Sequence, residues 1–485
     1  MYPPIFPTPE QMIQSEGAYH FGAGVMGRIH PTSLCPEQQT LLVSLFHQFA
    51  CTASTLSLLT DAALPDFTAV LGSCAIPELP QTADYTVHVT TQGVALRGRN
   101  VSGLLHAFYS LLQCIRPETL TDDTTDLAIP CLQIVDRPAL AFRGIHLCVF
   151  PETRLLQLEK AIRLAGICKF SHVVLEFWGT LRYDKMPELA WPDHSYEKAQ
   201  LRPLVALAQN LGMQVVPMFN HLGHATQSRS MYGRHVMLHQ NPRRALLFEP
   251  DGWTWCLSNP DTHKLLRAIR EELMALCGPS DAFHLGCDEA YSYASCPRCQ
   301  AQDHIALLSN YLNGLTAELA AQGRRAIIWG DALLDQTQWH APHIATSRPD
   351  QRTHEALPAL DRRLVIADWQ YDIESGDVPT SAYFLQQGFD TLLCPWDSSA
   401  NLRTLGAAAD TLQAMGMLAT TWHHLAGYLH QIPEAAGCAW RGKAYTSHPA
   451  QITCVGALTR KVMPKGASYA DAGWQSWEIE EGVRY

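Results

Sequence analysis

Residues 282–289 read AFHLGCDE: a short apolar strand that ends in a glycine, followed by two adjacent carboxylates, Asp288 and Glu289. The same order of apolar strand and polar end recurs from residue 143 onward, with amphipathic helical segments between the strands. This alternation predicts parallel βα units. The predicted strands are Gly144–Val149, His172–Phe177, Gln214–Phe219, Ala282–Gly286, Ala326–Trp329, Leu364–Trp369, Thr391–Cys394 and Met417–Trp422. Eight such strands favour a (β/α)8 TIM barrel over a doubly wound sheet.

The segment before the barrel has a different pattern. Tyr85–Arg97 alternates apolar and polar residues around a turn at Thr91-Gln92-Gly93, whereas Glu37–Ala50 and Val101–Leu112 have helical spacing. We therefore expect a small, non-catalytic α+β domain over residues 1–135. The block at 136–138 is the expected linker, because Pro138 disfavours helix in the residue before it. The barrel is expected over residues 136–465, and an aromatic C-terminal tail over 466–485.

Composition excludes several classes of protein. A chain of 485 residues that is 47% hydrophobic and carries a formal charge of -11 offers no basic surface for nucleic acid. It contains no run of 18 apolar residues, and its first ten residues lack the pattern of a secretory signal, so neither a membrane span nor secretion is expected. Fifteen cysteines, an odd number at internal positions, argue against a disulfide framework and favour a cytoplasmic protein. Oligomeric state stays open, with a homodimer among the alternatives.

Polar and aromatic residues gather where the predicted strands end, which in this fold is where substrates bind. Indole faces stack on the C–H faces of pyranose rings, so aromatic residues beside two carboxylates predict a sugar pocket. The aromatic residues assigned to this pocket are Trp329, Trp369, Tyr371, Trp396 and Trp422.

The stretch FHLGCDEAY, Phe283–Tyr291, resembles the His-x-Gly-x-Asp-Glu signature of glycoside hydrolase family 20, the β-N-acetylhexosaminidases. Residues 85–115 resemble the small zincin-like domain that precedes the barrel in this family. FRGIHL at 142–147 resembles the first strand, and HLGHA at 221–225 resembles the Pro-Gly-His segment. WGDALL at 329–334 and TTWHHLAGY at 420–428 place the likeness closest to the hexosaminidase D subgroup.

The resemblance implies retaining, substrate-assisted hydrolysis of terminal β-linked GalNAc or GlcNAc from a small molecule or oligosaccharide, with no cofactor and no metal. Asp288 would orient the acetamido group and stabilise an oxazolinium ion, and Glu289 would act as acid and base with a raised pKa. Arg143 would grip the outer hydroxyls of the sugar, and His224 would tune Glu289.

The chain departs from the family pattern at several strand ends. After strand two, Glu176 lies in an altered segment, and its position suggests that it takes over the role of a missing carboxylate. Cys394-Pro395-Trp396 replaces a Tyr-x-Asp segment. After strand eight, His424 stands where a glutamate usually binds the outer hydroxyls, so we expect GalNAc to be accepted at least as well as GlcNAc.

Two other functions remain open from the sequence. A metal-dependent hydrolase would use pairs such as His221 and His224, and a structural zinc could be held by Cys296 and Cys299, with Asp303 and His304 as the nearest further ligands. The other alternative is a sugar-binding barrel without catalysis, for which loss of Asp288 or Glu289 would be the signature.

Overall fold

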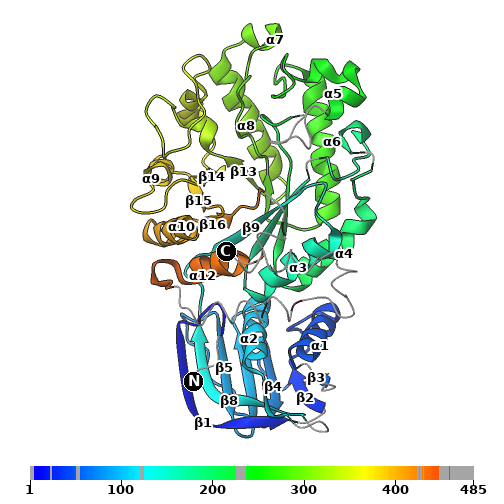
Figure 1. The fold of residues 1–485 in the computed structure, drawn as a ribbon, viewed down its shortest axis with the longest axis vertical. Helices are drawn as coiled ribbons and strands as arrows, with labels where there is room; N and C mark the ends of the chain where they lie inside the picture. Colours follow the sequence, from blue (N-terminus) through cyan, green and yellow to red (C-terminus); the bar gives the residue numbers. More distant parts are fainter. Residues whose placement is uncertain are drawn as a thin grey trace.

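The computed structural model describes residues 5–21, 24–50, 55–120, 125–177, 179–191, 193–225, 236–422 and 431–446, with single residues 425, 429, 458 and 462. A sheet domain and a closed barrel lie one above the other along the long axis of the molecule (Figure 1). This confirms the predicted fold class, a TIM barrel preceded by a small α+β domain.

The N-terminal domain is a mostly antiparallel sheet with the strand order β1-β8-β5-β6-β4-β2-β3, and β7 pairs with β8 outside this path. Its strands are β1 (Gln11–Phe21), β2 (Gly24–Ile29), β3 (Thr55–Thr60), β4 (Thr68–Gly72), β5 (Tyr85–Thr90), β6 (Gly93–Gly98), β7 (Arg116–Leu120) and β8 (Thr125–Asp136). Its helices are α1 (Pro36–Ala50) and α2 (Val101–Cys114). Helix α2 begins where the Asn100 side chain accepts from the Gly103 N–H at 2.9 Å. The predicted hairpin and both helices are confirmed, whereas the other strands were not predicted.

Eight parallel strands form the barrel, closing in the order β10-β11-β12-β13-β14-β15-β16-β9. They are β9 (Phe142–Val149), β10 (His172–Phe177), β11 (Gln214–Met218), β12 (Ala282–His284), β13 (Arg325–Trp329), β14 (Val365–Trp369), β15 (Asp390–Cys394) and β16 (Gly416–Ala419). The α-helices of this part of the chain are α3 (Leu155–Ile167), α4 (Lys198–Asn210), α5 (Val236–Gln240), α6 (Pro260–Cys277), α7 (Pro297–Gln300), α8 (His304–Ala320), α9 (Pro379–Gln386), α10 (Ser399–Thr411) and α12 (Gln431–Arg441). Short 3-10 helices are η1 (Pro187–Leu189), η2 (Pro242–Leu247), η3 (Asp331–Leu333), η4 (Thr353–Ala359) and η5 (Gly442–Ala444). All eight predicted strands exist, with ends that differ by a few residues.

Side chains along each barrel strand alternate between two apolar clusters. On β9, Phe142 and Cys148 belong to the cluster inside the barrel, and Ile145 and Leu147 belong to the larger core between the barrel and its surroundings. The same alternation holds on β10, where Val174 faces inward. Because successive side chains point to opposite faces, the parity of a residue on its strand decides whether it can reach the barrel interior.

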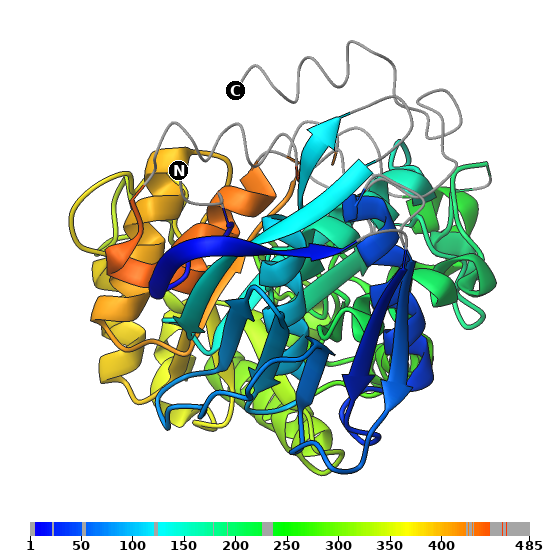
Figure 2. The same ribbon diagram turned by 90° about the horizontal axis from the view of Figure 1, so that it is seen from below.

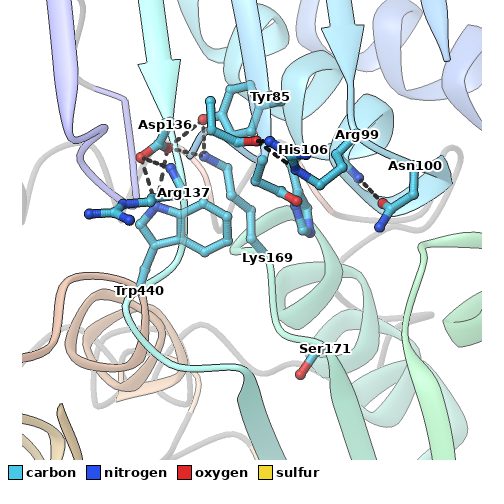
Figure 3. Close-up of polar contacts among 12 residues, drawn as sticks. Tyr85, Arg99, Asn100, His106, Asp136, Arg137, Lys169, Ser171 and Trp440 are labelled. Carbon is cyan, nitrogen blue, oxygen red and sulfur yellow. Dashed lines mark hydrogen bonds and ion pairs between the residues drawn. The ribbon is translucent and has the colours of Figure 1, made fainter. Parts of the chain in front are cut away.

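The sheet domain lies over one end of the barrel in the view from below (Figure 2). This is the end where the barrel strands begin, because Lys169, which precedes β10, contacts Tyr85 of the sheet domain. A buried polar cluster joins the two parts (Figure 3). Lys169 precedes β10 in the chain and is fully buried. Its ammonium donates to the Tyr85 hydroxyl at 2.7 Å and lies 3.5 Å from the Asp136 carboxylate. Trp440 donates through Nε1 to both Asp136 oxygens at 3.1 Å, and its ring lies 4.7 Å from the Lys169 nitrogen. Each charge in this cluster therefore has an opposite charge or hydrogen-bond donors around it.

None of the helices in the described ranges is both long and apolar enough to cross a membrane.

Replacing Lys169 with Met should destabilise the whole chain by about 3 to 5 kcal/mol, because the buried Asp136 carboxylate would lose its cation. Urea unfolding followed by circular dichroism measures this. The matched control, Lys264→Met, removes a lysine whose side chain is 77% exposed and should change stability by less than about 0.5 kcal/mol. Adding Asp136→Asn to Lys169→Met should restore part of the loss. A Lys169→Met protein as stable as the control would contradict this account of the interface.

Candidate active site

The two predicted catalytic carboxylates lie on a tight turn that follows β12. Gly286, Cys287 and Glu289 have φ values of 67°, 78° and 47°, in the left-handed region that non-glycine residues rarely adopt. A Cβ atom at Gly286 would lie 1.6 Å from the Asn220 side-chain oxygen, and one at Gly223 would lie 1.9 Å from the Asp288 carbonyl oxygen. The turn is therefore packed against the loop after β11, and both glycines are required by this close approach.

His224 connects the two carboxylates. Its Nε2 atom lies 2.9 Å from Glu289 Oε2 and 3.4 Å from Asp288 Oδ2. Burial alone would lower the pKa of the imidazole, but the neighbouring carboxylates outweigh burial and raise this pKa to about 10. One proton is therefore held between the three side chains at neutral pH. The expected contact between His224 and Glu289 is present.

Asp331, which was not among the predicted site residues, orders the same turn from the end of β13. Its carboxylate accepts from the Glu289 backbone N–H at 2.9 Å, from Thr346 Oγ1 at 2.6 Å and from Trp369 Nε1 at 3.0 Å. Burial, followed by the charge of Asp288, raises the pKa of Asp331 to about 7. Asp331 therefore fixes both the position of Glu289 and the orientation of an aromatic wall.

The five predicted aromatic residues come together at the mouth of the barrel. The Tyr371 ring lies 5.1 Å from that of Trp369 and 5.2 Å from that of Trp396, and its hydroxyl accepts from Trp422 Nε1 at 2.6 Å. Trp329 lies below them, 5.9 Å from Trp422, and its indole nitrogen is buried with no hydrogen-bond partner among the described residues. These rings provide stacking surfaces of the kind that sugars use.

Glu176 also reaches the barrel interior, where it holds two other polar side chains. Its carboxylate lies 2.9 Å from His146 Nε2 and accepts from Asn220 Nδ2 at 3.0 Å. The His146 ring in turn lies 4.6 Å from Trp422 and 6.0 Å from Trp329. The sequence analysis did not single out His146, although it has the inward parity of Cys148 on β9 and could have been found by that signal.

Arg143 is placed elsewhere, which corrects the expectation that it grips the sugar. It lies at the start of β9, and its guanidinium donates to the carbonyls of Leu140, Ala141 and Lys169. It also lies 5.0 Å from the Trp440 ring, in the contact with the sheet domain. The physical reason is parity: Arg143 shares the outward face of Ile145 and Leu147.

A tryptophan outside the predicted set contacts the site from another loop. Trp253 donates through Nε1 to the Glu289 carbonyl oxygen, and its ring lies 4.5 Å from His224 and 5.8 Å from Tyr291. It follows no barrel strand directly, so the strand-end pattern could not identify it. His424, the remaining predicted substrate-binding residue, lies outside the described residues.

The histidine pair considered as metal ligands is not formed. His221 is fully buried, its Nδ1 lies 2.6 Å from the Phe219 carbonyl oxygen, and its Nε2 accepts from Arg270 at 3.0 Å. Burial and the Arg270 charge hold the pKa of His221 well below its ordinary value. This ring therefore belongs to the packing behind the site, and of these two histidines it is His224 that faces the carboxylates.

Comparisons with known proteins identify the family of the chain. Residues 171–425, more than half of the chain, match the profile of glycosyl hydrolase family 20, catalytic domain. A beta-hexosaminidase of Vibrio furnissii is 25% identical over 293 residues, which cover 53% of this chain and 47% of the relative. A beta-hexosaminidase of Porphyromonas gingivalis is 21% identical over 277 residues, which cover 51% of this chain and 36% of the relative. The chain thus spans about half the length, or less, of these curated relatives.

Solved structures of low sequence identity share the fold. A β-N-acetylhexosaminidase of Bacteroides fragilis superposes with a TM-score of 0.66 at 17% identity, over 97% of this chain and 96% of that one. A Streptomyces plicatus beta-hexosaminidase superposes with a TM-score of 0.69 at 14% identity, over 98% of this chain and 97% of that one. With a profile match over more than half of its residues, the chain belongs to glycosyl hydrolase family 20.

Proposed function

We propose that this protein is an exo-β-N-acetylhexosaminidase that releases terminal β-linked GalNAc or GlcNAc with retention of configuration. One observation carries the proposal: Asp288 and Glu289 stand on one turn with His224 between them, at a barrel mouth walled by aromatic rings. Substrate-assisted hydrolysis of this kind is an exception to the usual two-carboxylate scheme for glycosides.

In the first step, the acetamido oxygen of the sugar attacks the anomeric carbon, and the bond to the leaving oxygen breaks as Glu289 supplies a proton. A water then attacks the same carbon, gives a proton back to Glu289, and reopens the oxazolinium ring. At neutral pH His224 holds a proton 2.9 Å from the Glu289 carboxylate, and transfer of this proton to Glu289 would give the acid form that the first step needs.

Asp288 would steady the acetamido group during both steps. It is buried, and its Oδ1 atom has no hydrogen-bond partner among the described residues, so this oxygen can accept the acetamide N–H. The same charge would then stabilise the oxazolinium ion in a site that excludes water. Asp331 assists by holding the Glu289 backbone in place.

The sugar ring would stack on the aromatic walls, with Trp329, Trp369 and Trp422 as its nearest surfaces and Tyr371 and Trp396 behind them. Glu176 and His146 would face its hydroxyl groups, since both are polar and point into the barrel. Arg143 has no part in this proposal.

The finer points of the proposal rest on sequence. The motifs HLGCDEAY, WGDALL and TTWHHLAGY support the hexosaminidase D subgroup, and His424 supports acceptance of GalNAc. A reducing compartment such as the cytoplasm is supported by the cysteines in the described ranges, which are all free thiols. A homodimer stays part of the proposal and is tested by light scattering.

Nitrophenyl β-GalNAc and β-GlcNAc should both be hydrolysed, GalNAc at least as fast. A proton-NMR time course should show the β-anomer of the released sugar first, because two inversions at the anomeric carbon restore its configuration. The α-anomer appearing first would contradict the mechanism. No hydrolysis of either glycoside, with binding retained, would favour a sugar-binding barrel without catalysis.

The two carboxylate variants should differ in their dependence on the leaving group. Glu289→Gln should lose about 10²- to 10⁴-fold in kcat/KM on glycosides with poor leaving groups and less on activated aryl glycosides, because only the former need the proton. Asp288→Asn should be slow on both, because the oxazolinium charge develops with either leaving group. A thiazoline mimic of the intermediate should bind Asp288→Asn much more weakly than the wild type.

Matched controls are Glu271→Gln and Asp377→Asn, which remove exposed carboxylates outside the site and should leave both rates unchanged. If Glu289→Gln and Asp288→Asn show the same leaving-group dependence and bind the thiazoline equally, the two roles are assigned wrongly.

The stability that His224 contributes should depend on pH. The pKa of His224 is raised in the folded state from 6.5 to about 10, so its contribution is full below about pH 6.5 and is lost as the pH rises to 10. The stability difference between the wild type and His224→Asn should therefore shrink by up to about 1.4 kcal/mol per pH unit in this window. Urea unfolding at several pH values measures it, with the exposed His340→Asn as control. A difference that does not change with pH would contradict the shared proton.

A further inference from the structure

Three cysteines and one glutamate form a buried cluster beside the catalytic turn. Glu249 and Cys256 come from the loop between η2 and α6, while Cys296 and Cys299 lie at the start of α7, a few residues after Glu289. Their ligand atoms all lie within 4.8 Å of one another, and all four residues are buried. The cluster plays no part in the mechanism proposed above.

The sulfur atoms have the spacing of a tetrahedral metal site. Cys256 Sγ lies 3.5 Å from Cys296 Sγ and 3.7 Å from Cys299 Sγ. Two sulfur ligands about 2.3 Å from a zinc ion at the tetrahedral angle are about 3.8 Å apart. A disulfide would instead need a sulfur–sulfur distance of about 2.05 Å. The observed distances therefore fit shared ligation better than a covalent bond.

The glutamate gives a second, independent sign of a cation-binding site. Glu249 is only 1% exposed, and its Oε2 atom accepts from the Cys296 N–H and from Ser295 Oγ. Its Oε1 atom is buried without a hydrogen-bond partner among the described residues, and no ion pair of Glu249 is found there. A buried carboxylate without a cation costs several kcal/mol, and a metal ion would remove this cost.

We propose that Cys256, Cys296, Cys299 and Glu249 bind one structural zinc ion. Thiolates select soft or borderline cations, and four protein ligands close the coordination shell, as in structural rather than catalytic zinc sites. The Cys299 N–H lies 3.5 Å from Cys296 Sγ and would help to neutralise the thiolates. Cys296 and Cys299, the pair considered from the sequence, are therefore joined by Glu249 and Cys256 as the other two ligands. Asp303 caps α8, and the group of clustered ligand atoms among the described residues includes neither Asp303 nor His304.

The zinc ion would clamp the two loops that meet at Glu289. Trp253, which contacts the Glu289 carbonyl and the His224 ring, lies between the ligands Glu249 and Cys256 on one loop. Ser292 donates to Thr254 at 2.9 Å between the loops, close to the same point. The ion would therefore be a positioning element for the catalytic turn, at a distance from the reacting atoms.

The first test measures the metal content of the full chain. The protein is purified without chelators under reducing conditions, and its zinc is measured by inductively coupled plasma mass spectrometry. The wild type should carry close to one zinc per chain. Cys256→Ala and Cys299→Ala should each bind zinc at least about tenfold more weakly. Cys277→Ala, which removes a buried thiol outside the cluster, is the matched control and should keep its zinc.

A second measurement uses the wild type alone, in case a variant does not fold. Zinc is removed with a chelator and titrated back, while hydrogen exchange is followed by mass spectrometry. Removal should increase exchange in peptides covering 249–256 and 287–299 more than in α10, and zinc should restore protection. Three results would each overturn the proposal. The wild type could fail to bind added zinc, or Cys256→Ala and Cys299→Ala could keep the zinc content of the wild type. The third is an intramolecular disulfide among these cysteines in the native reduced protein. These readouts do not depend on glycosidase activity.

Discussion

Pairing of the last barrel strand with the first is the constraint on which the rest of this structure depends. β16 lies parallel to β9, with Gly416 opposite Phe142, and a Cβ atom at Gly416 would lie 2.0 Å from the Phe142 carbonyl oxygen. At the other end of the same seam, Thr421 donates to the His146 carbonyl at 2.9 Å and accepts from the Cys148 N–H at 3.3 Å. Closure places the ends of all eight strands on one ring, so side chains far apart in the sequence meet at one mouth.

Several carboxylates lie close together at the barrel mouth, and nearby hydrogen-bond donors offset their negative charge. Asp288, Asp331 and Glu176 are all buried, which would be costly for isolated carboxylates. A proton on His224 lies between Asp288 and Glu289, three donors surround Asp331, and His146 and Asn220 hold Glu176. Asp288 and Glu289 therefore share His224, whereas Asp331 and Glu176 each have partners of their own.

At the opposite end of the barrel, buried cations join the barrel to the sheet domain. Arg143 and Lys169 face the sheet domain and are satisfied by carbonyl oxygens, by Asp136 and by the Trp440 ring. Burial lowers the pKa of both cations, and Asp136 and Asp84 oppose this effect. The two ends are thus built from similar side chains with different purposes: one end fixes the domains relative to each other, and the other leaves polar atoms for a ligand.

The sequence by itself determined the eight strands, the two helices of the first domain, and the position of Asp288 and Glu289 after Gly286, because hydrophobic period and glycine placement are local properties. Only the tertiary structure decided which side chains meet. It turned Arg143 outward, brought His146 and Asp331 inward, and placed Trp253 against Glu289 from a loop with no strand before it. It also joined Glu249 and Cys256 to Cys296 and Cys299 across about forty residues. Parity along a strand sorts His146 from Arg143, but which parity faces inward is decided only when the barrel closes. The contacts of Trp253 and Glu249 depend on how two loops pack against each other, which the spacing within either segment does not encode.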